Sequence, residues 1–195
     1  MAKRLSHEII ELNGLDTFVK AKIDAFGIEK VLLSFVKFDK TTKKSIQSVD
    51  VYVSFEEMKV LCNDILTGRI ALLAKEELKK GAAYPAAVWS SMGGTDADAC
   101  KKRGLRTDGK AMSRVLELCP GSRQPFVFQI KQGMGEVNSK GLIVPKFGNS
   151  PEVRILVPVN AEKLKAFALM INSFIDSYFT YQFLSGGYDY EYESK

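Results

Sequence analysis

The sequence predicts an α+β protein in which curved antiparallel β-sheets are packed by two helices. Four short strand patterns follow one another in the second half of the chain, with turn residues between them. Elsewhere, two alternating strand patterns each run almost directly into an amphipathic helix pattern. Hydrophobic residues make up 46% and charged residues 26% of the 195 residues, as in ordinary globular domains. We therefore expect one α+β domain over residues 30–185, with a pseudo-repeat of about 30–81 and 82–185.

Residues 1–29 are expected to form an N-terminal helical extension. Between positions 15 and 26 the apolar residues recur at helical spacing: Leu15, Phe18, Val19, Ile23 and Phe26. Gly27 then supplies a stop.

A hairpin is expected next. Residues 30–38 (KVLLSFVKF) are rich in Val, Leu and Phe, which favours a strand. Residues 45–54 (SIQSVDVYVS) alternate apolar and polar side chains, which is typical of a strand with one buried face. The polar turn between them, DKTTKK, joins the two strands.

A helix begins at Ser54, where Ser-Phe-Glu-Glu is a capping-box pattern. An apolar stripe that includes Met58, Leu61 and Ile65 follows it. Gly68 is expected to bend or break this helix, and a second helical stretch runs to Lys80.

The second half opens with a strand over residues 86–92 and a long exposed loop over 93–110. The four further strands are expected at 112–118, 125–131, 141–147 and 152–159, as an antiparallel meander. The last helix follows Asn160, a good N-cap. Residues 186–195 are expected to be a flexible acidic tail.

Two segments of the chain resemble each other. Residues 49–62 and 153–168 each contain an alternating strand that enters an amphipathic helix, and each helix carries Glu, a hydrophobe and Lys in the same order. A duplicated strands-then-helix unit predicts this match; a chance match within an α+β protein is the alternative.

The charge is concentrated in one region. The whole chain has a net charge of +5, whereas residues 101–154 carry eleven basic and four acidic residues, a net charge of +7. Such a concentration is what a phosphate-binding surface requires. The lone histidine, His7, and the absence of GxGxxG, Walker, GxSxG and HExxH motifs argue against an enzyme, a metal site and a cofactor.

Aromatic residues accompany this charge. Phe126 and Phe128 share one face of a strand, where they stack nucleic-acid bases if that face is open, or belong to the core if it is closed. Trp89, beside serine and glycine, is the better stacking candidate.

The cysteines are odd in number and far apart, which favours a reducing compartment over a disulfide framework. Cys62 and Cys119 lie on apolar faces and are expected to pack, whereas Cys100 lies among charges and is expected to be exposed. The N-terminus has no apolar segment of a secretory signal. We therefore expect a cytoplasmic protein.

The two strand–helix units and the basic meander GKAMSRVLELCPG–SRQPFVFQIKQGMGE–KGLIVPKF (109–147) resemble the Whirly and positive-cofactor-four group of single-stranded-DNA-binding proteins. The stretch is also similar to small proteins of Gram-positive conjugative elements and phages. The resemblance covers residues 30–184 and departs from the family in showing two clear strands before its first helix, where the family has four. It implies single strands lying across β-surfaces, with bases on aromatics and phosphates held by Lys and Arg, and a homo-oligomer.

The sequence thus predicts a non-enzymatic, sequence-tolerant protein that binds single-stranded nucleic acid, DNA before RNA, and serves a mobile element or phage. The residues expected to bind it are Trp89, Lys101, Lys102, Arg103, Arg106, Lys110, Arg114, Arg123, Phe126, Phe128 and Lys131. The tail segment Asp189–Glu193 resembles acidic tails that recruit protein partners or compete for the binding groove; an unstructured end is the alternative. A protein–protein adaptor or structural component is the alternative function, followed by an enzyme with an unrecognised carboxylate or cysteine site.

Overall fold

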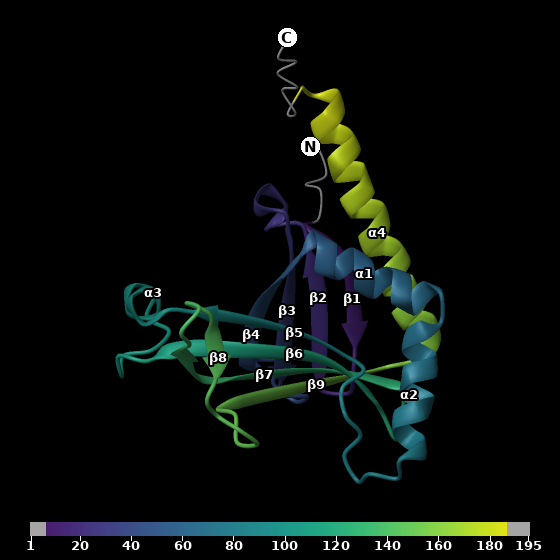
Figure 1. Ribbon diagram of the computed structural model, residues 1–195. Coiled ribbons are helices and arrows are strands. Elements are labelled where there is room, and N and C mark those ends of the chain that lie inside the picture. Colours follow the sequence, from purple (N-terminus) through teal and green to yellow (C-terminus); the bar gives the residue numbers. More distant parts are fainter. Residues whose placement is uncertain (1–6, 187–195) are drawn as a thin grey trace.

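The computed structural model describes residues 7–186. It confirms the α+β class, because this part of the chain forms two antiparallel sheets and four α-helices (Figure 1). The tail segment Asp189–Glu193 lies outside the described residues. No helix of the described part is long and apolar enough to cross a membrane.

The first sheet is a four-stranded meander. Its strands, in spatial and chain order, are β1 (Glu8–Asn13), β2 (Thr17–Lys22), β3 (Lys30–Phe38) and β4 (Ser45–Ser54). The predicted hairpin is confirmed as β3 and β4, in which Leu33 pairs with Val51. Val49, Val51 and Val53 of β4 are buried, so the alternation read from the sequence does mark the core face.

The predicted N-terminal helix is wrong. Residues 17–22 form β2, and Phe26–Ile28 form a single 3₁₀ turn, η1. In β2, Val19 and Ala21 are buried while Lys20 and Lys22 are only partly covered, which is a period of two. Apolar side chains on the second face, such as Phe18, give the segment its helix-like spacing. Pairing with β3 on one side and β1 on the other then decides for a strand.

The second sheet follows the two helices of the first half. Its strands are β5 (Trp89–Thr95), β6 (Ala111–Pro120), β7 (Phe126–Val137), β8 (Ile143–Pro145) and β9 (Val153–Val159). They pair in the order β5–β6–β7, and β7 continues into two partners along its other edge. Residues 126–132 of β7 pair with β9, whereas residues 135–137 pair with β8. The predicted meander is therefore present, with its last two strands sharing one edge.

The predicted long loop over residues 93–110 is interrupted by secondary structure. β5 continues to Thr95, and a short helix, α3 (Ala97–Lys102), follows. The Asp96 carboxylate caps this helix by accepting a hydrogen bond from the Ala99 amide at 2.7 Å.

The long helices begin and end where the sequence predicts. Helix α1 (Phe55–Leu66) starts at Ser54, whose hydroxyl accepts from the Glu57 amide. Gly68, with a φ of 82°, separates α1 from α2 (Arg69–Lys79). Helix α4 (Ala161–Leu184) starts at Asn160, whose side chain accepts from the Lys163 amide at 2.8 Å.

The burial patterns of the two strand–helix units match when their sequences are aligned so that Ser54 falls on Asn160. Four pairs of buried helix residues coincide in this alignment: Met58 and Leu164, Leu61 and Phe167, Cys62 and Ala168, and Ile65 and Ile171. Helices α1 and α4 lie together on the same side of the molecule, and their buried residues join those of both sheets in one core (Figure 1). In each half of the chain an antiparallel sheet thus precedes a helix, and the two helices pack together over one shared core.

Candidate nucleic-acid interface

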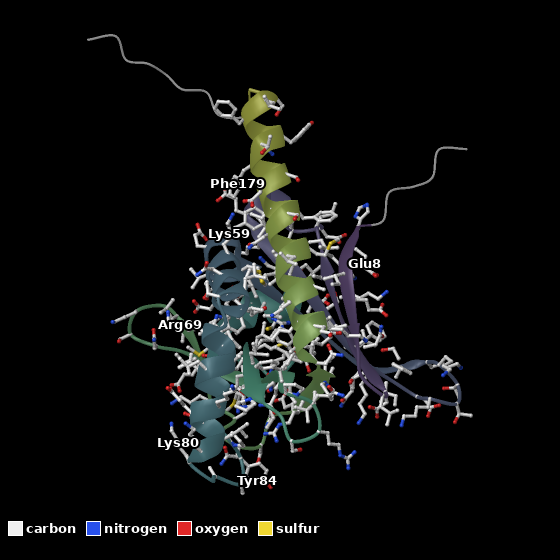
Figure 2. All side chains as sticks on the ribbon, turned by 90° about the vertical axis from the view of Figure 1, so that its right-hand side faces the viewer. Glu8, Lys59, Arg69, Lys80, Tyr84 and Phe179 are labelled. Atoms are coloured by element: carbon white, nitrogen blue, oxygen red, sulfur yellow. The ribbon has the colours of Figure 1, made fainter. Side chains whose placement is uncertain are left out.

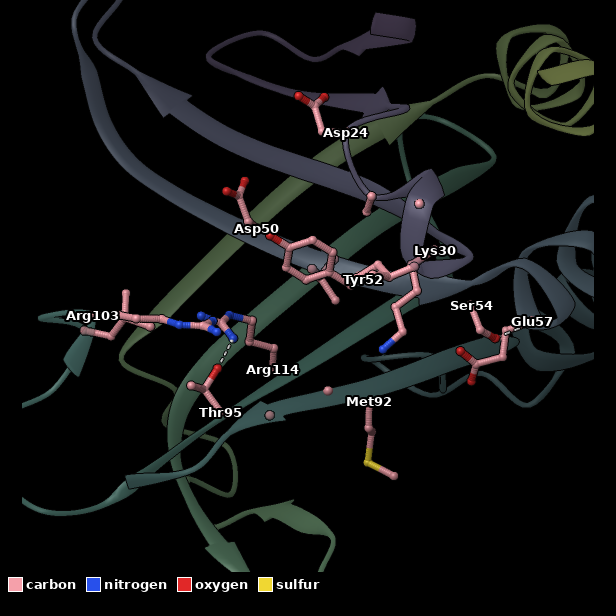
Figure 3. Close-up of a pocket in the computed structure, with 17 residues that line it drawn as sticks. Asp24, Lys30, Asp50, Tyr52, Ser54, Glu57, Met92, Thr95, Arg103 and Arg114 are labelled. Carbon is pink, nitrogen blue, oxygen red and sulfur yellow. Dashed lines mark hydrogen bonds between the residues drawn. The ribbon is translucent and has the colours of Figure 1, made fainter. Parts of the chain in front are cut away.

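An open cleft of about 750 Å³ lies where an edge strand of each sheet meets the other, at β4 and β5 (Figure 3). Its walls combine three basic side chains, three carboxylates, one tyrosine and several glycines. They include Lys30, Arg103, Arg114, Asp24, Asp50, Glu57, Tyr52, Gly27, Gly93 and Gly94. This volume is in the range of sites that bind small molecules or single nucleotides.

The wall from the first sheet comes from the polar face of β4. Because Val49, Val51 and Val53 point into the core, the residues between them point away from it. Asp50 and Tyr52 therefore face the cleft, and the Tyr52 side chain is 47% exposed. A half-exposed aromatic ring in a concave site offers a stacking surface to a planar ligand.

The wall from the second sheet is set by the glycines of β5 and by Arg114 of β6. Arg114 lies directly opposite Gly93 and on the same face as Leu116 and Leu118, which are fully buried further along the strand. A side chain at Gly93 would meet nothing within 4 Å. Gly93 thus keeps the cleft open in front of the Arg114 guanidinium, whereas a side chain at Gly94 would meet Ile143 on the other face of the strand.

Arg114 is held in place by neutral partners. Its Nε donates to Gln132 Oε1 at 3.0 Å, and its Nη1 donates to Thr95 Oγ1 at 3.1 Å. Burial lowers the pKa of this guanidinium, and the positive charge of Arg103 adds to the decrease, while Asp50 opposes it. Arg114 is therefore a positioned cation whose partners leave its charge uncompensated at hydrogen-bond range.

Arg103 reaches the cleft from the end of α3. The buried thiol of Cys100 anchors this helix, because its Sγ donates to the Thr95 carbonyl at 3.4 Å. The expectation that Cys100 is exposed is wrong: its neighbours in sequence are charged, but its own face of α3 packs on β5 and β6. Figure 3 shows the guanidiniums of Arg103 and Arg114 next to each other in the cleft.

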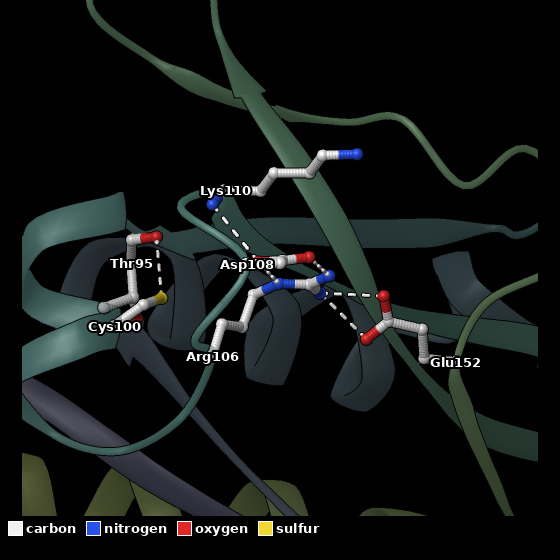
Figure 4. Close-up of polar contacts among 6 residues, drawn as sticks. All are labelled: Thr95, Cys100, Arg106, Asp108, Lys110 and Glu152. Carbon is white, nitrogen blue, oxygen red and sulfur yellow. Dashed lines mark hydrogen bonds and ion pairs between the residues drawn. The ribbon is translucent and has the colours of Figure 1, made fainter.

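Arg106 fixes the loop that follows α3 (Figure 4). Its guanidinium donates to Asp108 at 3.0 and 2.6 Å and to Glu152, before β9, at 2.7 and 2.8 Å. The hydrogen bonds from Arg106 lower the pKa of Asp108 to about 2, and the two carboxylates raise the pKa of Arg106. Arg106, predicted to contact phosphate, is thus occupied by two carboxylates.

Within residues 101–154, ion pairs involve only three of the eleven basic residues. All four acidic residues of this region form ion pairs within it: Asp108 and Glu152 with Arg106, Glu117 with Lys131, and Glu136 with Lys146. Eight other basic residues have no ion-pair partner among residues 7–186: Lys101, Lys102, Arg103, Lys110, Arg114, Arg123, Lys140 and Arg154.

The structure brings only some of the predicted phosphate contacts together. Lys101 and Lys102 are exposed on α3, next to Arg103 at the cleft, and Lys110 is exposed just before β6. Arg123 is exposed in the turn at the other end of β6. Lys131 lies on the opposite face of the sheet from Arg114 and pairs with Glu117 at 2.8 Å. These basic residues therefore lie on two opposite faces of the second sheet and at the two opposite ends of β6.

The predicted stacking residues are not in the cleft. Phe126 and Phe128 are buried in the core, so the closed-face alternative holds for both. Trp89 begins β5 half-buried and packs against the core, on the same face as its partner Leu118. Helices pack on the face that these three aromatics share, since Phe128 contacts Phe167 of α4 and α2 packs on β6. Neither strand periodicity nor composition indicates that cover.

Tyr52, Lys30 and Asp50 are the cleft residues that sequence reasoning missed. The alternation of β4 does place Asp50 and Tyr52 on its polar face. What it lacks is any indication that this face meets β5, some forty positions later in the chain.

In comparisons with known proteins, the sequence matches neither a family model nor a curated protein.

Proposed function

We propose that this protein binds single-stranded nucleic acid, DNA before RNA, through the cleft between β4 and β5 and without chemistry. The observation that carries the proposal is the pair of arginines, Arg103 and Arg114, which face an open cleft without a carboxylate partner in the described chain. Guanidinium groups prefer phosphate and carboxylate as ligands, because their donors match two oxygens at once.

A path for a strand continues beyond the cleft. Lys101 and Lys102 of α3 are exposed beside Arg103, and Lys110 follows on the same loop. These unpaired cations attract a phosphate backbone without reading its sequence. Tyr52 supplies a surface on which any base can stack. Both features favour binding that tolerates sequence.

The resemblance to the Whirly and positive-cofactor-four group remains our proposal for the family, with service to a mobile element or phage as its implied context. The missing strands of the first unit are present, since β1 to β4 precede α1. Both units then have the strands-then-helix order that the resemblance requires.

We also propose a homo-oligomer that forms through α4. Asp176 is the single charged residue from 166 to 184, and it pairs with Lys59 of α1. Beyond Phe179, the end of this helix projects past the other elements (Figure 2). Met170, Tyr181 and Leu184 are 40%, 68% and 78% exposed, and helical spacing places them on one face.

A second copy of the chain is the occupant that suits this face. Two-fold contacts bring identical surfaces together, and an uncharged apolar surface is complementary to itself. Met170→Glu with Tyr181→Glu is expected to reduce the mass measured by light scattering to that of a monomer. Leu72→Glu, at an exposed apolar position of α2, is the matched control. A native protein that is monomeric at micromolar concentration contradicts this part of the proposal.

Fluorescence anisotropy with a labelled single-stranded oligonucleotide tests the main proposal. Affinity is expected to fall linearly on a log–log plot against salt, with a slope of about −0.7 per phosphate neutralised. Reversal of Lys101, Lys102 and Arg103 to Glu is expected to abolish binding and leave the oligomer intact. Reversal of Lys40, Lys43 and Lys44, exposed in the β3–β4 turn, is the matched control.

The adaptor alternative predicts a different result. A protein whose basic surface is merely solvated binds no oligonucleotide even at low salt, and charge reversal on α3 changes nothing. Either outcome overturns the proposal.

A further inference from the structure

We infer that Arg103, Arg114 and Tyr52 form a site for one nucleotide, with its phosphate between the two guanidiniums and its base on the tyrosine ring. The inference deepens the proposed function and rests on it for the identity of the ligand as a nucleotide. At this site, two named arginines bind one phosphate group at a defined position, whereas the lysines on α3 attract any phosphate of the backbone without fixing its position.

Two positively charged side chains, Arg103 and Arg114, lie together in the cleft. Arg103 comes from the loop after α3 and Arg114 from the middle of the second sheet, yet both line the same cleft. Figure 3 shows their guanidiniums side by side. Like charges at short range repel in the absence of an anion, so an anion between them removes an unfavourable term.

Two hydrogen bonds fix the orientation of the Arg114 side chain. Gln132 and Thr95 bind its Nε and Nη1, respectively. The hydrogen bonds therefore position the side chain while leaving its second terminal nitrogen, Nη2, without a hydrogen-bond partner among the described residues. A positioned guanidinium loses little further conformational freedom when it binds an oxyanion.

The cleft contains equal numbers of basic and acidic side chains. Asp24, Asp50 and Glu57 line it together with Lys30 and the two arginines, so the cleft as a whole is close to neutral. The Glu57 carboxylate already accepts a hydrogen bond from Ser91 Oγ at 3.2 Å. The arginine pair is thus the place in this cleft where positive charge is concentrated, which defines the position of one phosphate group.

The Tyr52 ring provides an aromatic surface in the cleft. Tyr52 lies between the arginine pair and Lys30 in Figure 3, and its side chain is half-exposed. Gly93 lies in the wall from β5, where a Cβ would meet nothing within 4 Å, so a planar base has room against the backbone at this position. A nucleotide, which joins a planar base to a phosphate, matches both features.

The test is a titration of the full chain, followed by ¹⁵N–¹H NMR at the arginine Nε–H groups and the Tyr52 amide. The probes are thymidine 5′-monophosphate, thymidine, inorganic phosphate and an oligothymidylate with hydroxyl groups at both ends. The monophosphate is expected to shift all three signals saturably, and thymidine, which lacks phosphate, to bind at least tenfold more weakly.

Variants locate the site. Arg103→Gln and Arg114→Gln are each expected to weaken monophosphate binding at least tenfold, and Tyr52→Ala to weaken it while leaving inorganic phosphate unaffected. Arg103 is exposed and makes no ion pair in the described chain, so its substitution keeps the result interpretable if Arg114→Gln unfolds. Arg123→Gln, in the exposed turn after β6, is the matched control and is expected to bind like the native chain.

The two sources of phosphate are distinguished by competition. Displacement of the monophosphate by the oligothymidylate identifies a backbone diester as a ligand of the site, whereas failure to displace it identifies a terminal or free monoester. If oligonucleotides do not bind anywhere but the monophosphate binds through Arg103 and Arg114, the proposed function fails and the site stands. Monophosphate binding that is unchanged in both Arg103→Gln and Arg114→Gln overturns the inference, whatever the oligonucleotide does.

Discussion

Phe128 of β7 packs against Phe167 of α4, with their ring centroids 5.3 Å apart. Both side chains are fully buried, so this contact joins the second sheet to the helix that follows it in the chain. The pair explains why Phe128 belongs to the core and is not available to stack on a base.

Phe128→Ala is therefore expected to lower the free energy of unfolding by about 3–5 kcal/mol, the usual cost of removing a buried phenyl ring and leaving a cavity. Urea denaturation followed by circular dichroism measures the change. Under conditions where the variant is still folded, its oligonucleotide affinity is expected to match that of the native chain. Retained stability with lost binding would restore Phe128 as a stacking residue.

Local patterns in the sequence predict those parts of this fold that local interactions determine. Ser54, Gly68 and Asn160 mark helix boundaries because capping and a positive φ act within a few residues. The valines of β4 mark a core face because alternation is a property of one strand. The α+β class and the ends of the main helices follow from these features, whereas β1, β2 and α3 are not among the predicted elements.

The cleft depends on interactions that local patterns do not contain. Tyr52 and Arg114 belong to different sheets, and they meet because edge strands β4 and β5 come together after the helices between them have packed. Likewise, the phenylalanines of β7 alternate as an open face would, and the packing of the helices and the first sheet against them makes their side the interior. The β2 segment was misread for a related reason, since its helix-like spacing is outweighed by pairing on both edges.

The three cysteines are expected to be unreactive in the folded protein. Cys62 and Cys100 are fully buried, and burial raises the pKa of Cys62 to about 12. Cys119 is half-buried, and burial raises its pKa to about 11 from an ordinary 9.0. A raised thiol pKa lowers the thiolate fraction at a given pH, by about a hundredfold for Cys119 at pH 8.

Alkylation by iodoacetamide at pH 8, followed by intact-mass spectrometry, checks this expectation. The native chain should remain unmodified over a time in which the urea-unfolded chain gains three adducts. Rapid addition of one adduct to the native chain would show that a thiol is more accessible than its position indicates.

The ion pairs of Arg106 are expected to make stability depend on pH in the acid range. The folded pKa of Asp108 is about 2, below its ordinary 3.8, so folding favours the ionised carboxylate. The contribution is present above the unfolded pKa of 3.8 and is lost as the pH falls through about 2, where the carboxyl of the folded state also takes up a proton.

Asp108→Asn is accordingly expected to lose less stability than the native chain between pH 4 and pH 2. Denaturation midpoints measured at pH 7, 4 and 2.5 give the comparison, and Asp98→Asn, an exposed substitution on α3, serves as the control. Parallel pH profiles for native and Asp108→Asn chains would mean that the Arg106 contacts do not contribute to folding.

Gly93→Leu is expected to block ligand binding without disturbing the fold. Gly93 has no positive φ, and a Cβ there meets nothing within 4 Å, so the strand accepts a side chain at this position. Its face of β5 is the one that Arg114 shares, which directs the leucine into the cleft. The free energy of unfolding should stay within about 0.5 kcal/mol of the native value, while oligonucleotide affinity falls at least tenfold.

Ser90→Leu is the matched control for this variant, because Ser90 is exposed on the opposite face of the same strand. Anisotropy titrations of both variants at one salt concentration separate occlusion of the cleft from a general effect of added apolar surface. If Gly93→Leu binds as tightly as Ser90→Leu, nucleic acid does not enter the cleft between β4 and β5. The exposed lysines of α3 would then have to bind the strand outside it.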